Sequence, residues 1–562
     1  MTQRVLIIGL DGASPHLVHK WQTGLPNLSR LMAEGTSGVL WSVVPPRSVP
    51  AWYCFATGMN PAKIGVFGFS QRRPGTYDYT FANLTFCRAP TFWQWLNQHG
   101  VRTAVVHVPG TFPPHPVDGV MVSGWPAPLN RGNLIYTYPL ELSRELDRHL
   151  GRPFEFASEK PMRTDNDSEM LAERLRILRM HGEAARYVLN RYDWRVGVVI
   201  FGPVDRASHQ FWRHMDPHHP AHDPTLAERF GDALKQVYKA ADEEVGRLLD
   251  LLDDDDTVFI VSDHGFGPAY RIFYLNEWLR RQGYLALREE GAVGKVGWRT
   301  RLIGRLSAPL FWLNKASPTF RRWAAPLKKR TLSNLIRDEY VRAKERGLVR
   351  VNHAPVDWSR TRAYCPDEAA LYLNLRGRDP EGIVEPGVEA ESLLEEIIAG
   401  LQGIRDPETG QPVPVKLWRK EEIYQGPFLR DAPELIVAMD DYTTEVMAEL
   451  GSGTLFVPSD FRSGTHTLEG VFIARGPGIR AGKRMDAGLM DIAPTVVHLM
   501  GAPVPEEADG KVLLDLFEPE AELRRRSVAY RPVGIEAEAG EAYSAEEQAL
   551  IEKQLRDLGY LG

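Results

Sequence analysis

Six carboxylate and imidazole side chains, together with one serine hydroxyl, lie at or near the ends of predicted strands. The set comprises Asp11, Ser48, Asp205, His209, Asp263, His264 and His466. Their donor atoms are oxygen or nitrogen and never sulfur, which suits Zn²⁺ or Mn²⁺, and the set is large enough for two ions. Two divalent ions about 3.5–4 Å apart can clamp the attacking and leaving oxygens of an in-line phosphoryl displacement. The set therefore indicates metal-assisted phosphoryl chemistry.

Single members of the set also have ordinary structural explanations. Ser48 precedes Pro50, which suits the first turn of a helix, so the hydroxyl would lie where backbone N–H groups favour anions. The alternative is a common N-cap serine, just as Asp11-Gly12 is a common turn after a strand. A lone histidine such as His466 is more often structural than ligating. The case for a site therefore rests on the whole set.

Two pairs in the set have spacings that allow shared metal binding. Asp205 and His209 are four residues apart and can meet on one helical turn, although an ordinary loop pair explains them equally well. Asp263 and His264 are adjacent, so both reach a metal only in a sharp turn, which Gly265 permits.

The elements that position these residues follow an alternating pattern. The predicted strands are 5–10, 103–108, 196–201 and 257–262, and the predicted helices are 16–33, 167–192 and 225–252. This alternation predicts an α/β fold with a mostly parallel central sheet and helices on both faces. In such folds ligands bind outside the carboxyl ends of the strands, where the set lies.

The chain of 562 residues is longer than a usual domain of ~100–150 residues. After about residue 267 the alternation of strands and helices stops. A core strand predicted at 470–474 and a helix predicted at 491–500 then resume the α/β pattern. We expect a catalytic core at 1–270 and 456–520 and an inserted α+β cap at 271–455 that selects the substrate. The remaining 521–562 would form a tail with a short helix at 544–558.

Residues 295–350 carry fifteen Lys and Arg against three Asp and Glu. One hypothesis is peripheral contact of this stretch with anionic membrane, and another is attraction of a polyanionic substrate. The alternative is a cap whose aromatic residues pack on the core while its charges face water.

Composition excludes several classes of protein. Hydrophobic residues make up 43% of the chain and charged residues 25%, which is the ordinary globular mixture. Cys54, Cys87 and Cys365 show no C-x-x-C spacing, which argues against a disulfide framework or a thiolate metal site. The net charge of −6 does not require nucleic acid, and we expect none as a partner. Without an apolar run suited to a signal peptide or a membrane span, we expect a cytoplasmic protein. The sequence does not indicate an oligomeric state.

The ordered motifs resemble those of a known group. D-G, P-x-x-S-x-P-x-W with T-G-x-x-P, D-x-x-x-H, S-D-H-G and G-T-H occur in this order between Asp11 and His466. Together they resemble the alkaline phosphatase superfamily, and most closely its type I phosphodiesterase/nucleotide pyrophosphatase branch. Within that branch the chain is similar to bacterial proteins called predicted phosphohydrolases or phosphomutases. The resemblance implies an alkaline-phosphatase-like core.

The resemblance also implies a role for each motif residue. Asp11, Asp263 and His264 would hold one metal ion, with Ser48 bound to it as the nucleophile. The second ion would be held by Asp205, His209 and His466. A phosphoseryl-type intermediate would form on Ser48 and be hydrolysed, since metal coordination activates a weakly nucleophilic hydroxyl. Zn²⁺ is the first expectation and Mn²⁺ the second.

Two departures from related patterns bear on the substrate. Nucleotide pyrophosphatases usually read H-G-I-x-x-N after T-G-x-x-P, whereas this chain reads I-G-V-F-G-F and places Phe69 where the asparagine contacts phosphate. This weakens the expectation of a nucleotide substrate. Arg47 could supply a phosphate contact instead, or it could be a solvent-facing charge or a structural salt bridge. Sulfatases need an arginine where this chain has Trp52, so we reject that reading.

Phosphodiester hydrolysis is the leading expectation for activity. Monoester hydrolysis and phosphomutase chemistry are alternatives within the same superfamily. A transferase of phosphate-bearing headgroups and a non-catalytic binding protein are alternatives from other classes. The expected substrate is a phosphorylated small molecule or a lipid- or glycan-type phosphoester.

Overall fold

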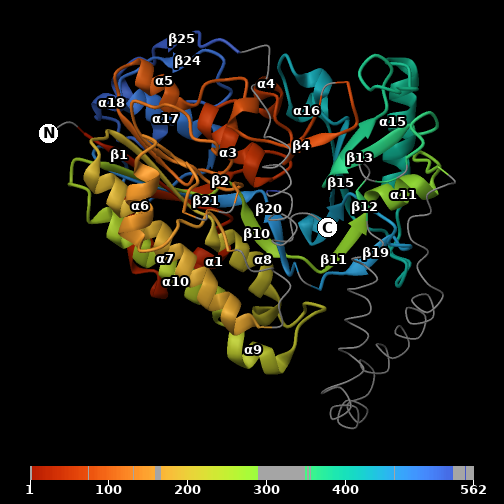
Figure 1. Ribbon diagram of the computed structural model, residues 1–562, viewed down its shortest axis with the longest axis horizontal. Helices are drawn as coiled ribbons and strands as arrows, with labels where there is room; N and C mark the ends of the chain where they lie inside the picture. The colour runs from red at the N-terminus through yellow and green to blue at the C-terminus, as the bar shows by residue number, and fades with distance from the viewer. Residues whose placement is uncertain are drawn as a thin grey trace.

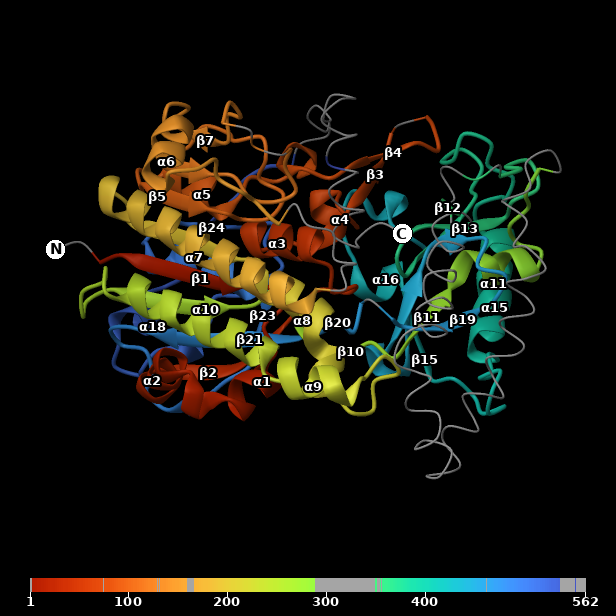
Figure 2. The same cartoon turned by 60° about the horizontal axis from the view of Figure 1, so that its bottom comes forward.

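The computed structural model describes residues 3–73, 75–128, 130, 132–158, 166–288, 349–350, 354, 356–460, 462–535 and 551. Its elements form two sheets that lie side by side, with helices packed against each (Figures 1 and 2).

The larger sheet has ten strands in the order β22-β2-β21-β9-β1-β8-β5-β6-β7, with β23 beside β2. The bounds are β1 Val5–Leu10, β2 Thr36–Trp41, β5 Thr103–Val106, β6 Gly119–Val122, β7 Thr137–Tyr138, β8 Val196–Phe201, β9 Thr257–Val261, β21 Glu469–Arg475, β22 Lys483–Arg484 and β23 Ala487–Gly488. The central strands β9, β1, β8, β5 and β6 run parallel, whereas β21 pairs antiparallel with both β9 and β2. The predicted α/β fold is confirmed.

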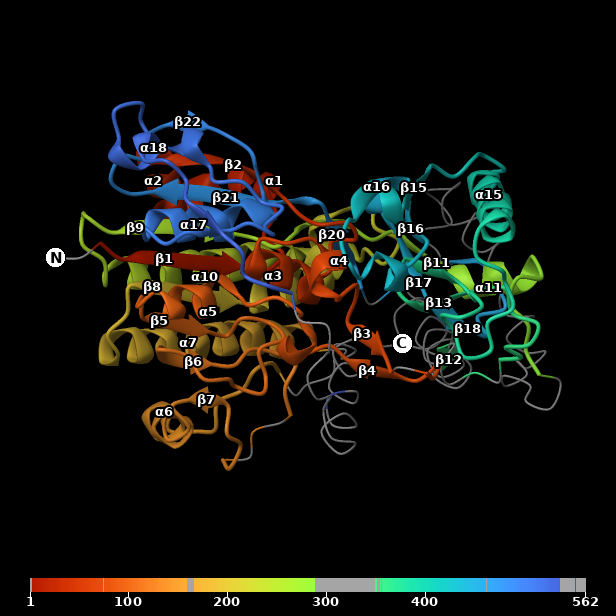
Figure 3. The same ribbon diagram turned by 90° about the horizontal axis from the view of Figure 1, so that it is seen from above.

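Helices cover both faces of this sheet, as Figures 1 and 3 show. On one face α7 (Asp167–Arg191), α8 (Pro203–Met215) and α10 (Ala233–Leu249) contact one another. On the other, α3 (Ser48–Thr57), α5 (Phe92–Gln98) and α17 (Ile492–Leu499) do the same. Every residue of β1, β8 and β9 is buried, as expected for strands covered on both sides.

Two predicted helices are interrupted. The stretch 16–33 forms α1 (Pro15–Lys20) and α2 (Pro26–Glu34), because Pro26 cannot continue a helix and instead begins a new one. The stretch 225–252 forms α9 (Pro224–Phe230) and α10, with Gly231 at the break.

The smaller sheet has the order β13-β14-β16-β17-β11-β19, with β15 beside β16. Its strands are β11 Arg271–Tyr274, β13 Ala363–Asp367, β14 Ala370–Leu373, β15 Val415–Arg419, β16 Leu435–Met439, β17 Thr444–Met447 and β19 Phe456–Pro458. Helices α11 (Leu275–Arg281) and α15 (Val388–Gln402) share an apolar cluster with it. We propose that this sheet is the core of the inserted cap.

A separate two-stranded antiparallel sheet joins the segment after β9 to the segment before β21. Strand β10 (Gly265–Pro268) follows β9, and β20 (Gly464–Thr467) precedes β21. Their register places Phe266 opposite His466. The remaining elements are α4 Pro61–Ile64, α6 Leu142–Leu150, α16 Lys420–Ile423, α18 Glu522–Arg525, β3 Ser70–Arg72, β4 Tyr79–Phe81, β12 Val349–Arg350, β18 Glu449–Leu450, β24 Val504–Pro505 and β25 Tyr530–Arg531.

Two predictions fall largely outside the described residues. Of the basic stretch 295–350 only Val349 and Arg350 are described, and of the helix predicted at 544–558 only Ile551. Among the described helices, none is both long and apolar enough to cross a membrane.

Candidate active site

The structure brings the predicted set together at the carboxyl ends of β1, β8 and β9. Asp11 directly follows β1, and Asp263 and His264 follow β9. Asp205 and His209 lie in α8, the helix that begins just after β8. Because these three strands are parallel neighbours, their ends deliver all five side chains to one edge of the sheet. All five are buried.

Ser48 and His466 reach the same place from other elements. Ser48 is the first residue of α3, and its Oγ lies 3.1 Å from His264 Nε2. His466 is carried by β20, and its ring stacks on that of His264 with 3.7 Å between centroids. The serine and the histidine are both buried.

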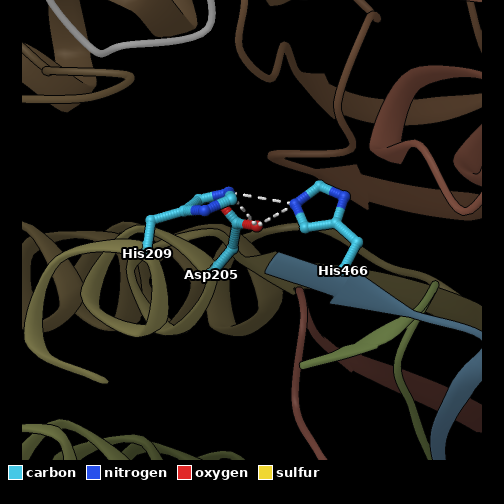
Figure 4. Close-up of side chains that lie close together, drawn as sticks. All are labelled: Asp205, His209 and His466. Atoms are coloured by element: carbon cyan, nitrogen blue, oxygen red, sulfur yellow. Dashed lines mark hydrogen bonds and ion pairs between the residues drawn. The ribbon is translucent and has the colours of Figure 1, made fainter. Parts of the chain in front are cut away.

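Asp205, His209 and His466 point toward one another from α8 and β20 (Figure 4). Asp205 Oδ1 lies 3.1 Å from His466 Nε2, and the Nε2 atoms of the two histidines are 3.0 Å apart. The Nδ1 atoms of His209 and His466 face the carbonyls of Gly464 and Pro46 at 2.7 and 2.8 Å. A carbonyl only accepts, so each Nδ1 carries the proton and each Nε2 keeps a lone pair. Two lone pairs and a carboxylate oxygen therefore converge, an arrangement that a cation satisfies.

His264 is oriented in the same way, in a neighbouring group that it forms with Asp11 and Asp263. Its Nδ1 lies 3.1 Å from the carbonyl oxygen of Gly265, so its Nε2 is also the lone-pair nitrogen. Asp263 Oδ2 and Asp11 Oδ1 lie 3.3 and 3.8 Å from that Nε2. The Ser48 hydroxyl is the donor available to it.

Asp11 and Asp263 each have one bonded and one unbonded carboxylate oxygen. Asp11 Oδ2 accepts from Trp52 Nε1 at 3.1 Å, and Asp263 Oδ1 accepts from the backbone N–H of Gly12 at 3.2 Å. The other oxygens, Asp11 Oδ1 and Asp263 Oδ2, are buried and have no hydrogen-bond partner among the described residues. Buried carboxylate oxygens are rarely left so, and a divalent ion is a partner that suits them. The residues present therefore fit a metal site.

The electrostatics of the buried cluster lead to the same conclusion. Burial, followed by repulsion from neighbouring carboxylates, raises the pKa of Asp11 and of Asp263 well above the ordinary value. Burial also lowers the pKa of His209 and His264 well below the ordinary value, which keeps both imidazoles neutral. Burial opposes ionisation of Asp205 as well, but the nearby His209, His466 and His264 hold its pKa below the ordinary range. A dication would favour the ionised form of these carboxyls and would bind the neutral imidazoles.

The two ligand groups adjoin through Asp205. Donor atoms of Asp205, His209 and His466 lie within 4.8 Å of one another, and so do those of Asp11, Asp205 and His264. Asp205 Oδ1 is 4.0 Å from His264 Nε2. The resemblance assigned Asp205 to one group alone, whereas the geometry lets its carboxylate face both.

Arg47 lies beside Ser48 but forms a salt bridge with Glu368 on the smaller sheet's side. Glu368 also pairs with Arg462 at 3.1 Å, and Arg462 Nη2 is 3.4 Å from His209 Nε2. Arg47 thus forms a structural salt bridge, one of the alternatives that the sequence left open for it. Arg462 was missed by sequence reasoning, and its only signal was its position four residues before His466.

Phe69 packs against Trp125, with 5.8 Å between ring centroids. Trp125 lines a cavity of about 30 Å³ next to Ser48, Asp11 and Asp205, and the Arg206 guanidinium lies 4.6 Å from its ring. Phe69 therefore packs against a residue that lines this cavity. Trp125 lies outside the recognised motifs, and Arg206 occupies an unassigned position within D-x-x-x-H; neither was predicted.

An α/β core with carboxylates, imidazoles and a serine gathered at its strand ends has the architecture of a hydrolase of phosphoric esters. The chain belongs to the type I phosphodiesterase/nucleotide pyrophosphatase family, whose model matches residues 5–310. That family places it among enzymes that cleave phosphodiester and pyrophosphate bonds.

Solved structures give a more distant comparison. The human and murine forms of ectonucleotide pyrophosphatase/phosphodiesterase 5 each show 13% sequence identity and a TM-score of 0.49. Each match covers 92% of this chain and 100% of the other. One further murine structure, of an inactive form in complex with AMP, has the same values. No curated protein sequence matches this chain.

Proposed function

We propose that the protein is a two-metal phosphohydrolase that cleaves phosphodiesters with Ser48 as nucleophile. The observation that carries this proposal is the convergence of three imidazole lone pairs and two unpartnered carboxylate oxygens around the Ser48 hydroxyl.

The donor set supports two ions bound by oxygen and nitrogen. One would be held by Asp11, Asp263 and His264 and the other by His209 and His466, with Asp205 facing both. When bound, the ions would supply positive charge that activates the serine oxygen and offsets charge on the phosphoryl oxygens. Zn²⁺ and Mn²⁺ both suit these ligands, with Zn²⁺ the first expectation.

The chain's own residues account for position and attack. Ser48 begins a ten-residue helix, so its Oγ lies beside free backbone N–H groups that favour phosphoryl oxygens. In the first step, a bond forms from Ser48 Oγ to phosphorus as the bond to the leaving alcohol breaks, and the alcohol departs with a proton. In the second step, water displaces Ser48 from phosphorus and the serine regains its proton. Burial of the cluster keeps bulk water from competing.

The substrate would be a phosphorylated small molecule. Two cavities border the cluster through different residues, one at Ser48 and Asp205 and the other at Arg47 and His466. A diester carries two substituents, so this arrangement favours a diester over a monoester.

A paired assay tests the proposal. Bis-p-nitrophenyl phosphate and p-nitrophenyl phosphate are compared with added Zn²⁺, with Mn²⁺ and with EDTA. We expect faster turnover of the diester, loss of turnover in EDTA, and loss in Ser48→Ala with metal content retained. Ser29→Ala is the matched control, because its hydroxyl lies far from the cluster at the surface and bonds the carbonyl of Gln22. Equal activity of wild type and Ser48→Ala would refute Ser48 as the nucleophile, and faster monoester turnover would reassign the enzyme to phosphatase or mutase chemistry.

A further inference from the structure

The second cavity lies between the larger sheet and the smaller sheet. Pro46, Arg47 and His466 line it from the core, and strands β15 to β17 with the turn between them line it from the other side. Its volume is about 40 Å³. A single water needs about 10–15 Å³, so the space suits a group of about three heavy atoms and is too small for a nucleobase.

Two buried polar atoms on this lining have no partner within the part of the chain that the structure describes. They are the Tyr442 hydroxyl and Glu445 Oε2. The other oxygen of Glu445 is engaged by Arg462 Nε at 3.3 Å. Buried polar atoms in native proteins are nearly always hydrogen-bonded, so an unpaired donor and an unpaired acceptor in one cavity indicate that water or a ligand group fills this space.

The backbone that carries Tyr442 is strained. Asp440, Asp441 and Tyr442 have φ angles of 49°, 48° and 71°, a run of three non-glycine residues in the left-handed region between β16 and β17. Such residues occur singly in ordinary turns, and runs persist only where other contacts hold them, most often at functional sites. Arg271 provides such a contact, because its Nη2 bonds Asp440 Oδ2 at 2.6 Å. The turn thus holds the tyrosine in the cavity wall.

The chemistry of the lining selects among possible occupants. A carboxylate oxygen only accepts hydrogen bonds, whereas a tyrosine hydroxyl can donate, so the pair suits a ligand with one hydroxyl for each. Trp418 adds an aromatic wall, with its ring 6.5 Å from that of Tyr442. An additional anionic group would meet the charge of Glu445, and an aliphatic group would leave both polar atoms unpaired.

We propose that this cavity binds a short hydroxyl-bearing substituent of the phosphodiester, of glycerol type, through Tyr442 and Glu445. The assignment rests on the proposed function, because the cavity borders the cluster that would hold the phosphoryl group. It makes Tyr442 and Glu445 determinants of substrate specificity.

Two diesters that share a leaving group test the assignment. Glyceryl p-nitrophenyl phosphate carries two free hydroxyls, and propyl p-nitrophenyl phosphate has the same carbon chain without them. We expect the wild-type kcat/KM for the glyceryl ester to exceed that for the propyl ester by about tenfold, as two net hydrogen bonds would give. Tyr442→Phe and Glu445→Gln should each bring this ratio toward one. Tyr284→Phe, which removes a hydroxyl bonded to Glu396 elsewhere on the smaller sheet's side, should leave the ratio unchanged.

A binding measurement separates failure of this assignment from failure of the proposed function. Calorimetry with glycerol phosphate and propyl phosphate, on the metal-loaded Ser48→Ala protein, needs no turnover. Tighter binding of glycerol phosphate that is lost with Tyr442→Phe would support the assignment even if neither diester is hydrolysed. Equal affinity for the two ligands, or a wild-type kcat/KM ratio near one with Ser48-dependent turnover, would overturn it while leaving phosphodiester hydrolysis intact.

Discussion

At the scale of single residues, backbone carbonyls determine what the buried histidines can do. His209, His264 and His466 each direct Nδ1 at a carbonyl oxygen, so each presents Nε2 to the cluster as an acceptor. Among the described residues no hydrogen bond reaches Asp11 Oδ1 or Asp263 Oδ2, and Arg462 Nη2 approaches His209 Nε2 only weakly, at 3.4 Å. This is why the cluster is better explained as a metal site than as an ion-pair network.

Asp263→Asn should reduce turnover of bis-p-nitrophenyl phosphate by at least about 100-fold and lower the bound metal, because an amide replaces a charged ligand oxygen. Activity and metal content per chain, by elemental analysis, check this. Asp254→Asn is the control, since that exposed side chain lies in the turn before β9 and faces solvent. Unchanged metal content in Asp263→Asn would exclude Asp263 as a ligand.

Gly12→Ala should impair the site through the backbone. Gly12 has φ of +68°, and an added Cβ would lie 2.7 Å from the Phe266 ring and 3.2 Å from the Asp205 Cα. We expect at least about tenfold lower activity and a loss of about 2 kcal/mol in unfolding free energy. Gly100→Ala, at φ of +72° with open space around it among the described atoms, should cost about 1 kcal/mol and keep activity. Similar activity losses in both variants would show that the crowding at Gly12 is unimportant.

At the scale of elements, α7 holds α8 in place, and α8 carries Asp205 and His209. Asp167 at the start of α7 accepts from Arg213 Nη2 at 3.0 Å and from His214 Nε2 at 3.0 Å, both near the end of α8. Burial by itself would raise the pKa of Asp167, but these two hydrogen bonds hold it below the ordinary value. The ionised carboxylate therefore stabilises the docking of the two helices.

Asp167→Asn should lower the unfolding free energy by about 1–3 kcal/mol at neutral pH, the range for hydrogen bonds to a charged group. A carboxyl whose pKa is lowered in the folded state stabilises above its unfolded pKa of about 3.9 and loses that effect as pH falls through the folded value. The difference from wild type should therefore be full above pH ~5 and shrink below pH ~4. Urea unfolding across this range measures it, with the exposed Asp193→Asn as control. A difference that is independent of pH would contradict the role of the charge.

At the scale of the whole molecule, the Glu368 carboxylate connects the smaller sheet to the edge of the larger sheet at which the candidate site lies. Glu368, in the turn between β13 and β14, pairs with Arg47 beside Ser48 and with Arg462 beside His209. Burial, and then the neighbouring Arg462, lower the pKa of Arg47 to about 10. Glu368 therefore offsets two close buried cations where the two sheets meet.

Glu368→Gln should remove the charged partner that Arg47 and Arg462 share and lower the unfolding free energy by about 3 kcal/mol. The change should also raise KM more than it lowers kcat, because the cavity between the sheets would loosen while Ser48 and its neighbours keep their contacts. Denaturant unfolding and steady-state kinetics measure the two effects. Glu385→Gln, which breaks an exposed pair with Arg376, should cost less than about 1 kcal/mol. If the Glu368 variant is no less stable than this control, the Glu368 carboxylate does not stabilise the contact between the two sheets.

The sequence by itself determined the strands β1, β5, β8, β9 and β21 of the larger sheet and the polar residues that lie near the ends of several of them. The stretches 5–10 and 196–201 were predicted to the residue, because a strand buried on both faces must be apolar throughout. The seven chemistry-bearing residues were found because each motif stands near the end of such an element. Local breakers such as Pro26 and Gly231 were underweighted, so two helices were predicted longer than they are.

Tertiary structure alone decided how distant residues meet. Nothing local to Arg462, Tyr442 or Glu445 shows that the first approaches His209 or that the other two line a cavity with Arg47. Likewise, the acceptor nitrogen of each histidine depends on which carbonyl the fold places against its ring, and for His466 that carbonyl belongs to Pro46. Periodicity reports which face of an element is buried, whereas these contacts depend on strand order and on the packing of one sheet against the other, which a local pattern does not encode.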